Sequence, residues 1–146
     1  GDSEVFASMA ANFNDDLNFK LVVDLVIRTK PDNLFRLIDF KTTAWGWPLT
    51  KKTDKWKNYQ LAYYKHFFSL IKDIDPSLMK CYFGFVKRVS KEDREIEFYE
   101  ASIGPARIHN ALKVIDNVVD SMERKFFPKN RLSCDYCVYR KTSWCP

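Results

Sequence analysis

Apolar residues concentrate in two short stretches that flank a polar turn in the first third of the chain. Residues 19–28 are rich in Val, Ile and Leu, and residues 30–33 (Lys-Pro-Asp-Asn) have turn chemistry. The second stretch follows directly and contains Asp39-Phe40-Lys41. The pattern therefore predicts an antiparallel β-hairpin whose second strand carries these three residues.

Helical spacing replaces the strand pattern after a loop that contains Gly46 and Pro48. Thr53 or Asp54 can cap a helix, and Pro76 marks its end. Larger residues recur at three- and four-residue intervals between these points. This spacing predicts a buried stripe formed by Trp56, Tyr59, Gln60, Tyr63, Phe67, Leu70 and Ile71.

The second half of the chain repeats the order of two strands and a helix. Residues 79–89 and 95–103 are predicted strands around a polar turn at 90–94, and a second helix begins at Gly104-Pro105 and stops at Pro128. Its apolar face consists of Ile108, Leu112, Ile115, Val119, Met122 and Phe126. Residues 1–18 predict no clear element beyond a short extended piece. We expect an α/β (α+β) fold with a small mixed central β-sheet flanked by helices.

Three side chains of the predicted hairpin carry the candidate chemistry. Because side chains alternate along a strand, Asp39 and Lys41 point to the same face. A symmetric loop centred on Pro31 and Asp32 places Asp24 opposite Asp39, where two like charges destabilise the pair. The pair therefore predicts a divalent-metal site with an ammonium group beside it. A β-bulge would instead move Asp24 to the other face, and an ordinary exposed Asp39–Lys41 ion pair is the simpler alternative.

Gln60 lies on the predicted apolar stripe, where an amide needs partners to be buried without a free-energy penalty. Tyr64 follows one turn later on the same side of the helix. Both side chains are predicted to reach the metal site or a nucleic-acid backbone. The alternative is a Gln60 side chain at the edge of the stripe that points to water.

Composition limits the class of protein. The chain has 146 residues with 46% apolar content, only 4 Gly and 6 Pro, which suits one globular core. No segment approaches the roughly 20 apolar residues of a membrane span, and no signal-peptide pattern is present, so we expect a cytoplasmic protein with no membrane partner.

The net charge is +5. Four basic residues, interleaved with Trp45, Trp47 and Trp56, suggest nucleic-acid binding, although a solubilising surface is the alternative: Lys51, Lys52, Lys55 and Lys57.

Together these residues resemble the PD-(D/E)xK nuclease superfamily, and within it the RecB/Cas4-like exonucleases. The family pattern is an Asp in one strand, Asp/Glu-x-Lys in the next, and Gln-Leu-x-x-Tyr on a helix. The matching residues are Asp24, Asp39, Lys41, Gln60, Leu61 and Tyr64. The resemblance covers about residues 20–70.

The resemblance implies a restriction-endonuclease-like core and cleavage of DNA phosphodiesters with Mg²⁺ or Mn²⁺. Asp24 and Asp39 are then metal ligands together with the carbonyl of Phe40, and Lys41 acts in catalysis. Leu21 stands where the family usually has Gly. The family also has an acidic residue or His on an upstream helix. Since the chain begins with Gly, we expect a fragment of a longer protein from which this helix is missing.

The four cysteines divide into one and three. Cys81 lies in a predicted strand and is expected to be a core residue. The resemblance implies that Cys134, Cys137 and Cys145 belong to a [4Fe-4S] cluster, for which four thiolates are needed. We expect the cluster to be incomplete in this fragment. Zinc and a disulfide are alternatives.

These patterns predict a nuclease core over residues 1–128 and a cysteine-bearing tail over 129–146. The predicted function is a metal-dependent deoxyribonuclease, exonucleolytic by resemblance, in bacterial or phage DNA processing. Its predicted partner is DNA with ends, and any helicase or recombination partner is unknown. A non-catalytic nucleic-acid-binding or scaffolding module on the same fold is the alternative, and a structural metal module in the tail is a third possibility.

Overall fold

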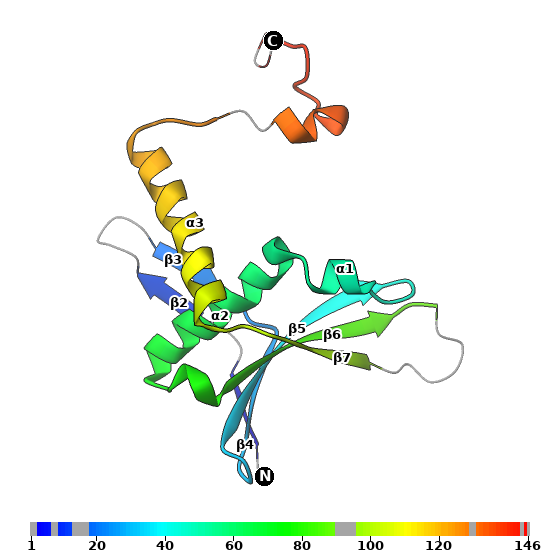
Figure 1. The fold of residues 1–146 in the computed structure, drawn as a ribbon, viewed down its shortest axis with the longest axis vertical. Coiled ribbons are helices and arrows are strands. Elements are labelled where there is room, and N and C mark those ends of the chain that lie inside the picture. The colour runs from blue at the N-terminus through cyan, green and yellow to red at the C-terminus, as the bar shows by residue number, and fades with distance from the viewer. Residues whose placement is uncertain are drawn as a thin grey trace. The chain divides into compact units, whose positions relative to one another are not determined.

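A computed structural model describes residues 3–6, 9–12, 18–89, 96–128, 131–143 and 145 (Figure 1). The chain divides into two compact units, Gly1–Lys113 and Val114–Pro146. The first unit contains both β-sheets, and the second contains the end of the last helix and the tail.

The first unit is built on a mixed five-stranded sheet. Its strands, in spatial order, are β1 (Ser3–Phe6), β4 (Leu25–Thr29), β5 (Leu34–Thr43), β6 (Met79–Lys87) and β7 (Ile96–Ala101). β5 and β6 are parallel, and the other neighbouring strands are antiparallel. A separate two-stranded sheet pairs β2 (Met9–Asn12) with β3 (Asn18–Leu21). The mixed sheet with helices confirms the predicted fold class.

The β4–β5 hairpin has the predicted register. Leu25 pairs with Ile38 and Thr29 with Leu34, without a bulge between them. At the turn, the Asp32 carboxylate accepts a hydrogen bond from the Leu34 amide at 3.1 Å, and Asn33 takes a positive φ of 54°. Asn tolerates this conformation better than most residues, so the turn sequence directly supports the register.

For the first 28 residues, one prediction was incomplete and one was wrong. Residues 1–18 were expected to contain at most a short extended piece, and two strands, β1 and β2, lie there. The predicted continuous strand at 19–28 is instead split between β3 and β4, with a bend at Asp24. β3 belongs to the small sheet and β4 to the large one, so the chain must change direction between them.

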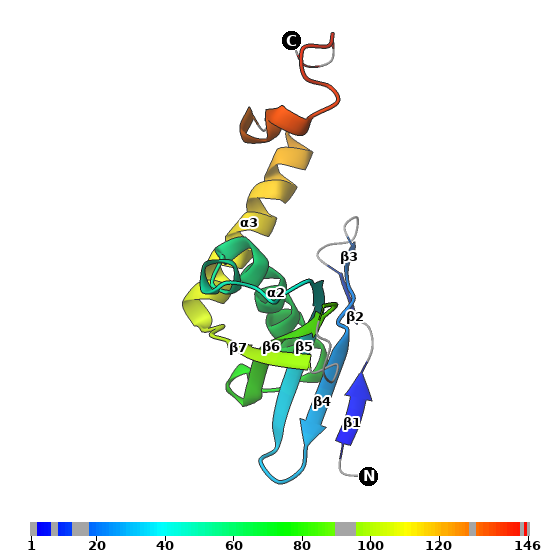
Figure 2. The ribbon, with the colours of Figure 1, turned by 90° about the vertical axis from the view of Figure 1, so that its right-hand side faces the viewer.

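The crossover between β5 and β6 contains two helices, α1 (Leu49–Lys52) and α2 (Lys55–Lys72). α1 was not predicted. Asp54 caps α2 as expected, because its side chain accepts hydrogen bonds from the amides of Trp56 and Lys57. Helix α2 lies across one face of the sheet and contacts β5 and β6 (Figure 2).

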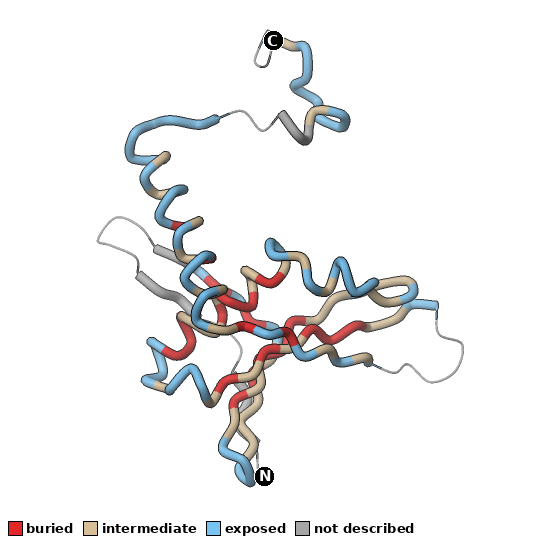
Figure 3. Tube along the Cα trace, viewed as in Figure 1, coloured by how far each residue is buried: buried red, intermediate tan, exposed pale blue. Residues whose placement is uncertain are grey.

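The buried side of α2 differs from the predicted stripe (Figure 3). Trp56, Leu70 and Ile71 are exposed by 59%, 63% and 44%. The buried residues are Asn58, Leu61, Ala62, Tyr64, Phe67, Phe68 and Ser69. Only Phe67 belongs to both sets, because aromatic residues occupy more than one side of this helix and their spacing alone does not select one.

The remaining elements follow the predicted order. β6 and β7 confirm the strands expected at 79–89 and 95–103, with slightly shorter bounds. The turn predicted at 90–94 lies outside the described residues. Helix α3 (Pro105–Glu123) confirms the second helix, although Met122 and Phe126 of its predicted apolar face are exposed. In the second unit, residues Arg131–Tyr136 form a 3-10 helix.

Candidate active site

Asp39 lies on the sheet face that α2 covers. Its parallel partner in β6 is Phe83, and its neighbour on the same face of β5 is Leu37, both fully buried. The Asp39 side chain is itself only 2% exposed. Strand alternation thus places a carboxylate among apolar side chains, where an uncompensated charge is strongly disfavoured.

Lys41 supplies one compensating charge. Its Nζ atom lies 2.7 Å from Asp39 Oδ2, as expected for residues two apart on one strand. Oδ2 is buried, and no donor besides the Lys41 ammonium reaches it among the described residues. The charge of this buried carboxylate is therefore offset at Oδ2 by one ammonium group.

Asp24 reaches the site by a route that was not predicted. The β4–β5 ladder begins at Leu25, so Asp24 lies in the bend just before the strand and is exposed. Its Oδ2 accepts a hydrogen bond of 2.7 Å from the backbone N–H of Phe40. The expectation that Asp24 is a strand residue was wrong, yet this bond ties its carboxylate to the backbone next to Asp39.

The electrostatics of Asp39 reflect its burial. Desolvation raises the pKa of the Asp39 carboxyl above its ordinary value, Lys41 opposes this increase, and the Asp24 charge adds to it. Two neighbouring carboxylates, one of them buried, fit a hard divalent cation. Mg²⁺ requires only one or two protein carboxylates because it retains several waters.

Helix α2 brings Gln60 and Tyr64 to the same place. Gln60 Oε1 accepts a hydrogen bond from Lys41 Nζ at 3.1 Å, and Gln60 Nε2 donates to the Tyr64 hydroxyl at 2.7 Å. Tyr64 is 5% exposed, and burial raises its pKa. The alternative in which Gln60 points to water is therefore wrong. Its amide links the two helical residues to Lys41.

Phe40 contributes through its backbone. Its ring lies on the opposite face of the strand and meets Phe98 edge-on, with ring centroids 6.4 Å apart. Gly84 is the neighbour of Phe40 across the sheet, and a Cβ there would lie 2.6 Å from Phe40 Cδ1. The sequence analysis missed Gly84, whose isolated position within a predicted strand was the available signal.

The four predicted nucleic-acid-binding lysines differ in their surroundings. Lys52 forms an ion pair of 2.5 Å with Glu97, which also pairs with Lys87. These two lysines lower the pKa of Glu97. Lys51, Lys55 and Lys57 instead lie over indole rings, as described below. Lys52 is thus occupied within the protein, which weakens its assignment to a nucleic-acid surface.

Asn58 is a structural residue that the sequence analysis missed. It is 1% exposed, and its Nδ2 donates hydrogen bonds of 2.8 Å to the carbonyl oxygens of Lys52 and Asp54. It therefore joins the end of α1 to the start of α2. A polar residue so close to a helix cap is ordinary in sequence, and nothing in the local pattern marked it as buried.

The tail cysteines belong to the second unit. Cys137 is exposed, Cys134 and Cys145 are half-buried, and the Cys137 amide donates to the Cys134 carbonyl at 3.2 Å. Within the described ranges, no three His, Cys, Asp or Glu side chains gather closely enough to hold a metal ion. The iron-sulfur assignment stays a prediction. Cys81 is 2% exposed and is a core residue, as expected.

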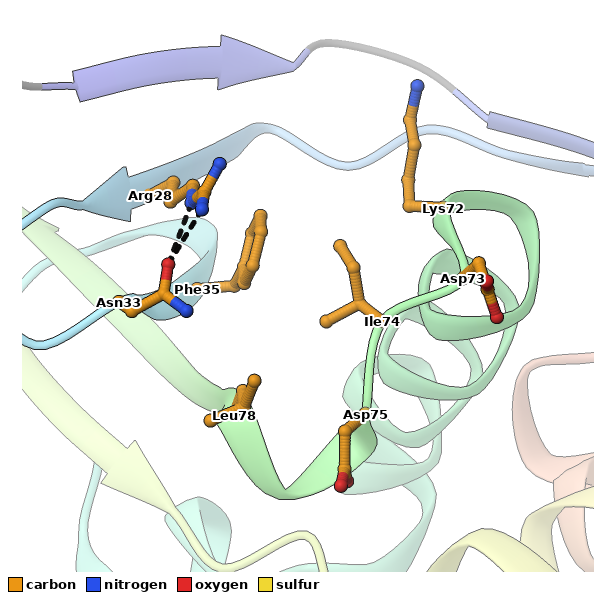
Figure 4. Close-up of a pocket in the computed structure, with 8 residues that line it drawn as sticks. All are labelled: Arg28, Asn33, Phe35, Lys72, Asp73, Ile74, Asp75 and Leu78. Carbon is orange, nitrogen blue, oxygen red and sulfur yellow. Dashed lines mark hydrogen bonds between the residues drawn. The ribbon is translucent and has the colours of Figure 1, made fainter.

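A pocket of about 360 Å³ lies at the other end of the β4–β5 hairpin (Figure 4). Arg28 donates two hydrogen bonds to Asn33 Oδ1 at its edge, and Phe35, Ile74 and Leu78 provide apolar walls. None of the candidate site residues lines it. Its mixed charges do not indicate a particular ligand.

Among the helices that the structure describes, none has the length and apolar content to cross a membrane.

Comparisons with known proteins identify the family of this chain. No curated protein matches the chain. The family model of the PD-(D/E)XK nuclease superfamily matches residues 2–146, which is nearly the whole sequence. The chain therefore belongs to the PD-(D/E)XK nuclease superfamily.

Proposed function

We propose that the chain is a divalent-metal-dependent deoxyribonuclease that removes nucleotides from DNA ends. The observation that carries this proposal is the buried Asp39 carboxylate, which lies next to Asp24 and has the Lys41 ammonium as its ion-pair partner. Membership in a nuclease superfamily supports the reaction class. The preference for DNA ends rests on the likeness to RecB/Cas4-type exonucleases.

Asp24 and Asp39 would hold Mg²⁺ or Mn²⁺, with the Phe40 carbonyl as a third protein ligand. Such an ion, when bound, lowers the pKa of a bound water and stabilises negative charge on the phosphate under attack. The hydrogen bond from the Phe40 amide keeps the exposed Asp24 carboxylate beside the strand. This bond reduces the side-chain freedom that would otherwise be lost when the ion binds.

Lys41 provides the second part of the proposed chemistry. Its ammonium lies beside Asp39, where it can orient the attacking water and offset the developing negative charge. Gln60 is a positioning residue, because its carbonyl oxygen accepts a hydrogen bond from the Lys41 ammonium while Tyr64 fixes the orientation of the amide. The reactive ammonium is thus held from both the strand and the helix.

A non-catalytic binding module on the same fold is the second candidate. A module of this kind gains nothing from a buried carboxylate whose charge opposes folding. A buried carboxylate–ammonium pair is instead expected where chemistry requires it. The free-energy cost of burying the Asp39 charge therefore favours an enzyme over a binding module.

The test compares cleavage and metal binding in matched variants. End-labelled linear DNA and covalently closed circular DNA are incubated with Mg²⁺ or Mn²⁺, and Mn²⁺ binding is measured by calorimetry. Asp39→Ala should abolish Mn²⁺ binding and cleavage. Lys41→Ala should retain Mn²⁺ binding and cleave roughly 10²–10³-fold more slowly. The exposed residues Asp116 and Lys113 on α3, each changed to Ala, are the controls and should behave as wild type.

Two results would contradict the proposal. Unchanged Mn²⁺ affinity in Asp39→Ala would move the metal away from this site, and wild-type protein that binds Mn²⁺ without cleaving either DNA would favour the binding module. Cleavage of circular DNA as fast as linear DNA would leave the nuclease in place and remove the requirement for ends.

A further inference from the structure

We propose that Trp45 and Trp56, together with Lys51, Lys55 and Lys57, form a surface that stacks unpaired DNA bases beside the candidate active site. We call these five residues the indole–lysine surface. The inference rests on the proposed function for its ligand, since it specifies how the same site would hold a DNA strand. It concerns binding and is therefore testable without cleavage.

Trp45 lies in a turn that is closed by hydrogen bonds between Thr43 and Gly46. The Thr43 hydroxyl accepts a hydrogen bond from the Gly46 amide and donates one to the Gly46 carbonyl oxygen, both at 3.1 Å. Gly46 has a φ of 97°, a conformation that favours glycine. The indole of Trp45 is 78% exposed. Since a large apolar ring usually gains free energy from burial, its exposure in this turn is consistent with a ligand-binding surface.

Trp56 is the second exposed indole, and its distance from the site follows from helix geometry. It precedes Gln60 by four residues on α2, so the two side chains lie one turn apart on the same side of the helix. Gln60 is hydrogen-bonded to Lys41. Trp56 therefore lies close to the candidate active site, with Tyr59 edge-on against it at 5.5 Å.

Trp47 gives the contrast within the same segment. Its ring packs against Phe83 and Phe85, with centroids 5.4 and 5.2 Å away. The fold therefore offers an apolar place for an indole in this region, and Trp47 occupies it. Trp45 and Trp56 have the same side chain and are exposed to solvent.

The charges around these rings suit phosphates. Lys55 Nζ lies 5.0 Å from the centre of the Trp56 ring, and Lys51 and Lys57 lie 4.6 and 5.7 Å from that of Trp47. The acidic residue in this segment, Asp54, uses its side chain to cap α2. Lys55 thus lies over an exposed indole, and Lys51 and Lys57 lie over the packed ring of Trp47. Lysines in these positions can contact the backbone of a strand while its bases stack on Trp45 and Trp56.

An unpaired strand fits this surface better than a duplex. In a duplex, each base already stacks on its neighbours, so its faces are covered except at the ends. A single strand leaves the faces of its bases available, and stacking on an aromatic side chain is tolerant of sequence. Charge complementarity, two exposed indoles and continuity with the candidate active site therefore indicate the same ligand.

The test measures binding in EDTA, which prevents cleavage, by fluorescence anisotropy. The probes are a labelled oligothymidylate, an abasic strand of the same length and a blunt hairpin duplex. The abasic strand keeps the phosphates and lacks the bases. The variants are Trp45→Ala, Trp56→Ala and the corresponding Phe substitutions. Leu70→Ala is the control, because Leu70 is equally exposed at the far end of α2.

The expected result is tighter binding of oligothymidylate than of the abasic strand by the wild type. Each Ala variant should lose roughly 5- to 150-fold in affinity for oligothymidylate, the range that base–aromatic stacking contributes. The abasic affinity should be unchanged, and the Phe variants should keep most of the binding. Leu70→Ala should match the wild type with every probe.

Equal affinity for the oligothymidylate and the abasic strand would overturn the proposal. Equal losses on both strands in the Ala variants, or an equal loss on the duplex, would also overturn it. The outcome is separable from that of the proposed nuclease activity. If the wild type cleaves DNA but binds the oligothymidylate and the abasic strand equally, only the proposed stacking surface is contradicted. If it prefers the oligothymidylate but does not cleave DNA, only the proposed nuclease activity is contradicted.

Discussion

At the residue scale, the buried charge of Asp39 lowers the stability of the fold and is needed for the proposed metal site. It is a carboxylate with 2% exposure, and its buried oxygen Oδ2 has no donor besides the Lys41 ammonium among the described residues. Burial raises its pKa. A raised pKa means that the folded protein binds a proton more tightly than the unfolded chain, so the ionised group opposes folding.

We predict that Asp39→Asn stabilises the metal-free protein. For a raised pKa, the free energy of unfolding falls as the pH rises from the ordinary value of 3.8 through the folded pKa, and the full cost is present above it. Removing the charge should raise the melting temperature in EDTA at neutral pH by about 3 °C, the shift that roughly 1 kcal/mol produces in a domain of this size.

Thermal unfolding with and without Mn²⁺ checks this prediction. Mn²⁺ should stabilise the wild type, because it binds the folded state, and should have no effect on Asp39→Asn. A lower melting temperature for the variant in EDTA would mean that the Lys41 ion pair outweighs the desolvation of the carboxylate.

Cys81 gives a second prediction at this scale. Burial raises the pKa of its thiol to about 12, so little of the reactive thiolate exists at neutral pH. Iodoacetamide at pH 8 should therefore modify the exposed Cys137 and leave Cys81 unmodified until urea unfolds the protein. Mass spectrometry of peptides identifies the sites. Modification of Cys81 under native conditions would show that β6 opens readily.

At the element scale, β5 and α2 together assemble the candidate site. β5 presents Asp39 and Lys41 on one face, and α2 brings Gln60 to the Lys41 ammonium. The parallel strand β6 completes the support, since Gly84 leaves room for the Phe40 ring. The Phe40 backbone in turn holds Asp24.

Gly84→Ala tests this support. The new Cβ would lie 2.6 and 2.7 Å from Phe40 Cδ1 and Cε1, so the ring must move. We expect a loss of about 1–3 kcal/mol in the free energy of unfolding, measured by urea denaturation. The Mn²⁺ affinity should also fall, because the strand that holds Asp24 is displaced.

A double-mutant cycle with Phe40→Ala provides the control. Once the ring is absent, adding Gly84→Ala should cost much less, with a coupling energy of roughly 0.5–3 kcal/mol. Simple additivity of the two substitutions would show that the Gly84 effect arises from the strand backbone and not from the Phe40 ring.

At the scale of the whole molecule, the net charge is modest, and the basic side chains differ in whether an acidic partner occupies them. The net charge is +5, and Lys52 and Lys87 share the Glu97 carboxylate in ion pairs. Lys51, Lys55 and Lys57 lie over indoles. Close contacts with the phosphates of a polyanion should therefore depend on these three lysines more than on Lys52.

Salt dependence measures how many lysines take part. For single-stranded DNA, each neutralised phosphate contributes about −0.7 to the slope of log Kobs against log[salt]. We predict that Lys55→Gln makes the slope shallower by about 0.7 for oligothymidylate in EDTA. Lys52→Gln should leave the slope unchanged and lower stability. The same change of slope in both variants would contradict the division between these lysines.

Much of the fold was predictable because its signals are local. The turn at 30–33 set the hairpin register, Asp54 marked the start of α2, and Gly104-Pro105 marked the start of α3. Each signal acts through hydrogen bonds or allowed backbone angles between near neighbours in the chain. The strands β1 and β2 carried no such signal. The partner of β1 is the distant strand β4, and β2 pairs with the next strand, β3.

The candidate site was predictable in its members but not in its contacts. The resemblance named Asp24, Asp39, Lys41, Gln60 and Tyr64, and the structure brings all five together. The bend at Asp24, the amide of Phe40 as its donor and the Gln60–Lys41 hydrogen bond were not predicted. These contacts depend on where separate elements meet.

The sequence by itself determined the hairpin register, the two long helices, the mixed sheet and the superfamily pattern, because spacing and turn chemistry act over a few residues. Only the tertiary structure decided which side of α2 is buried. It also decided which lysine is neutralised and which tryptophans stay in solvent. The physical reason is that a helix with aromatic residues on several sides can bury more than one of them, and the sheet and neighbouring loops select among these sides by packing.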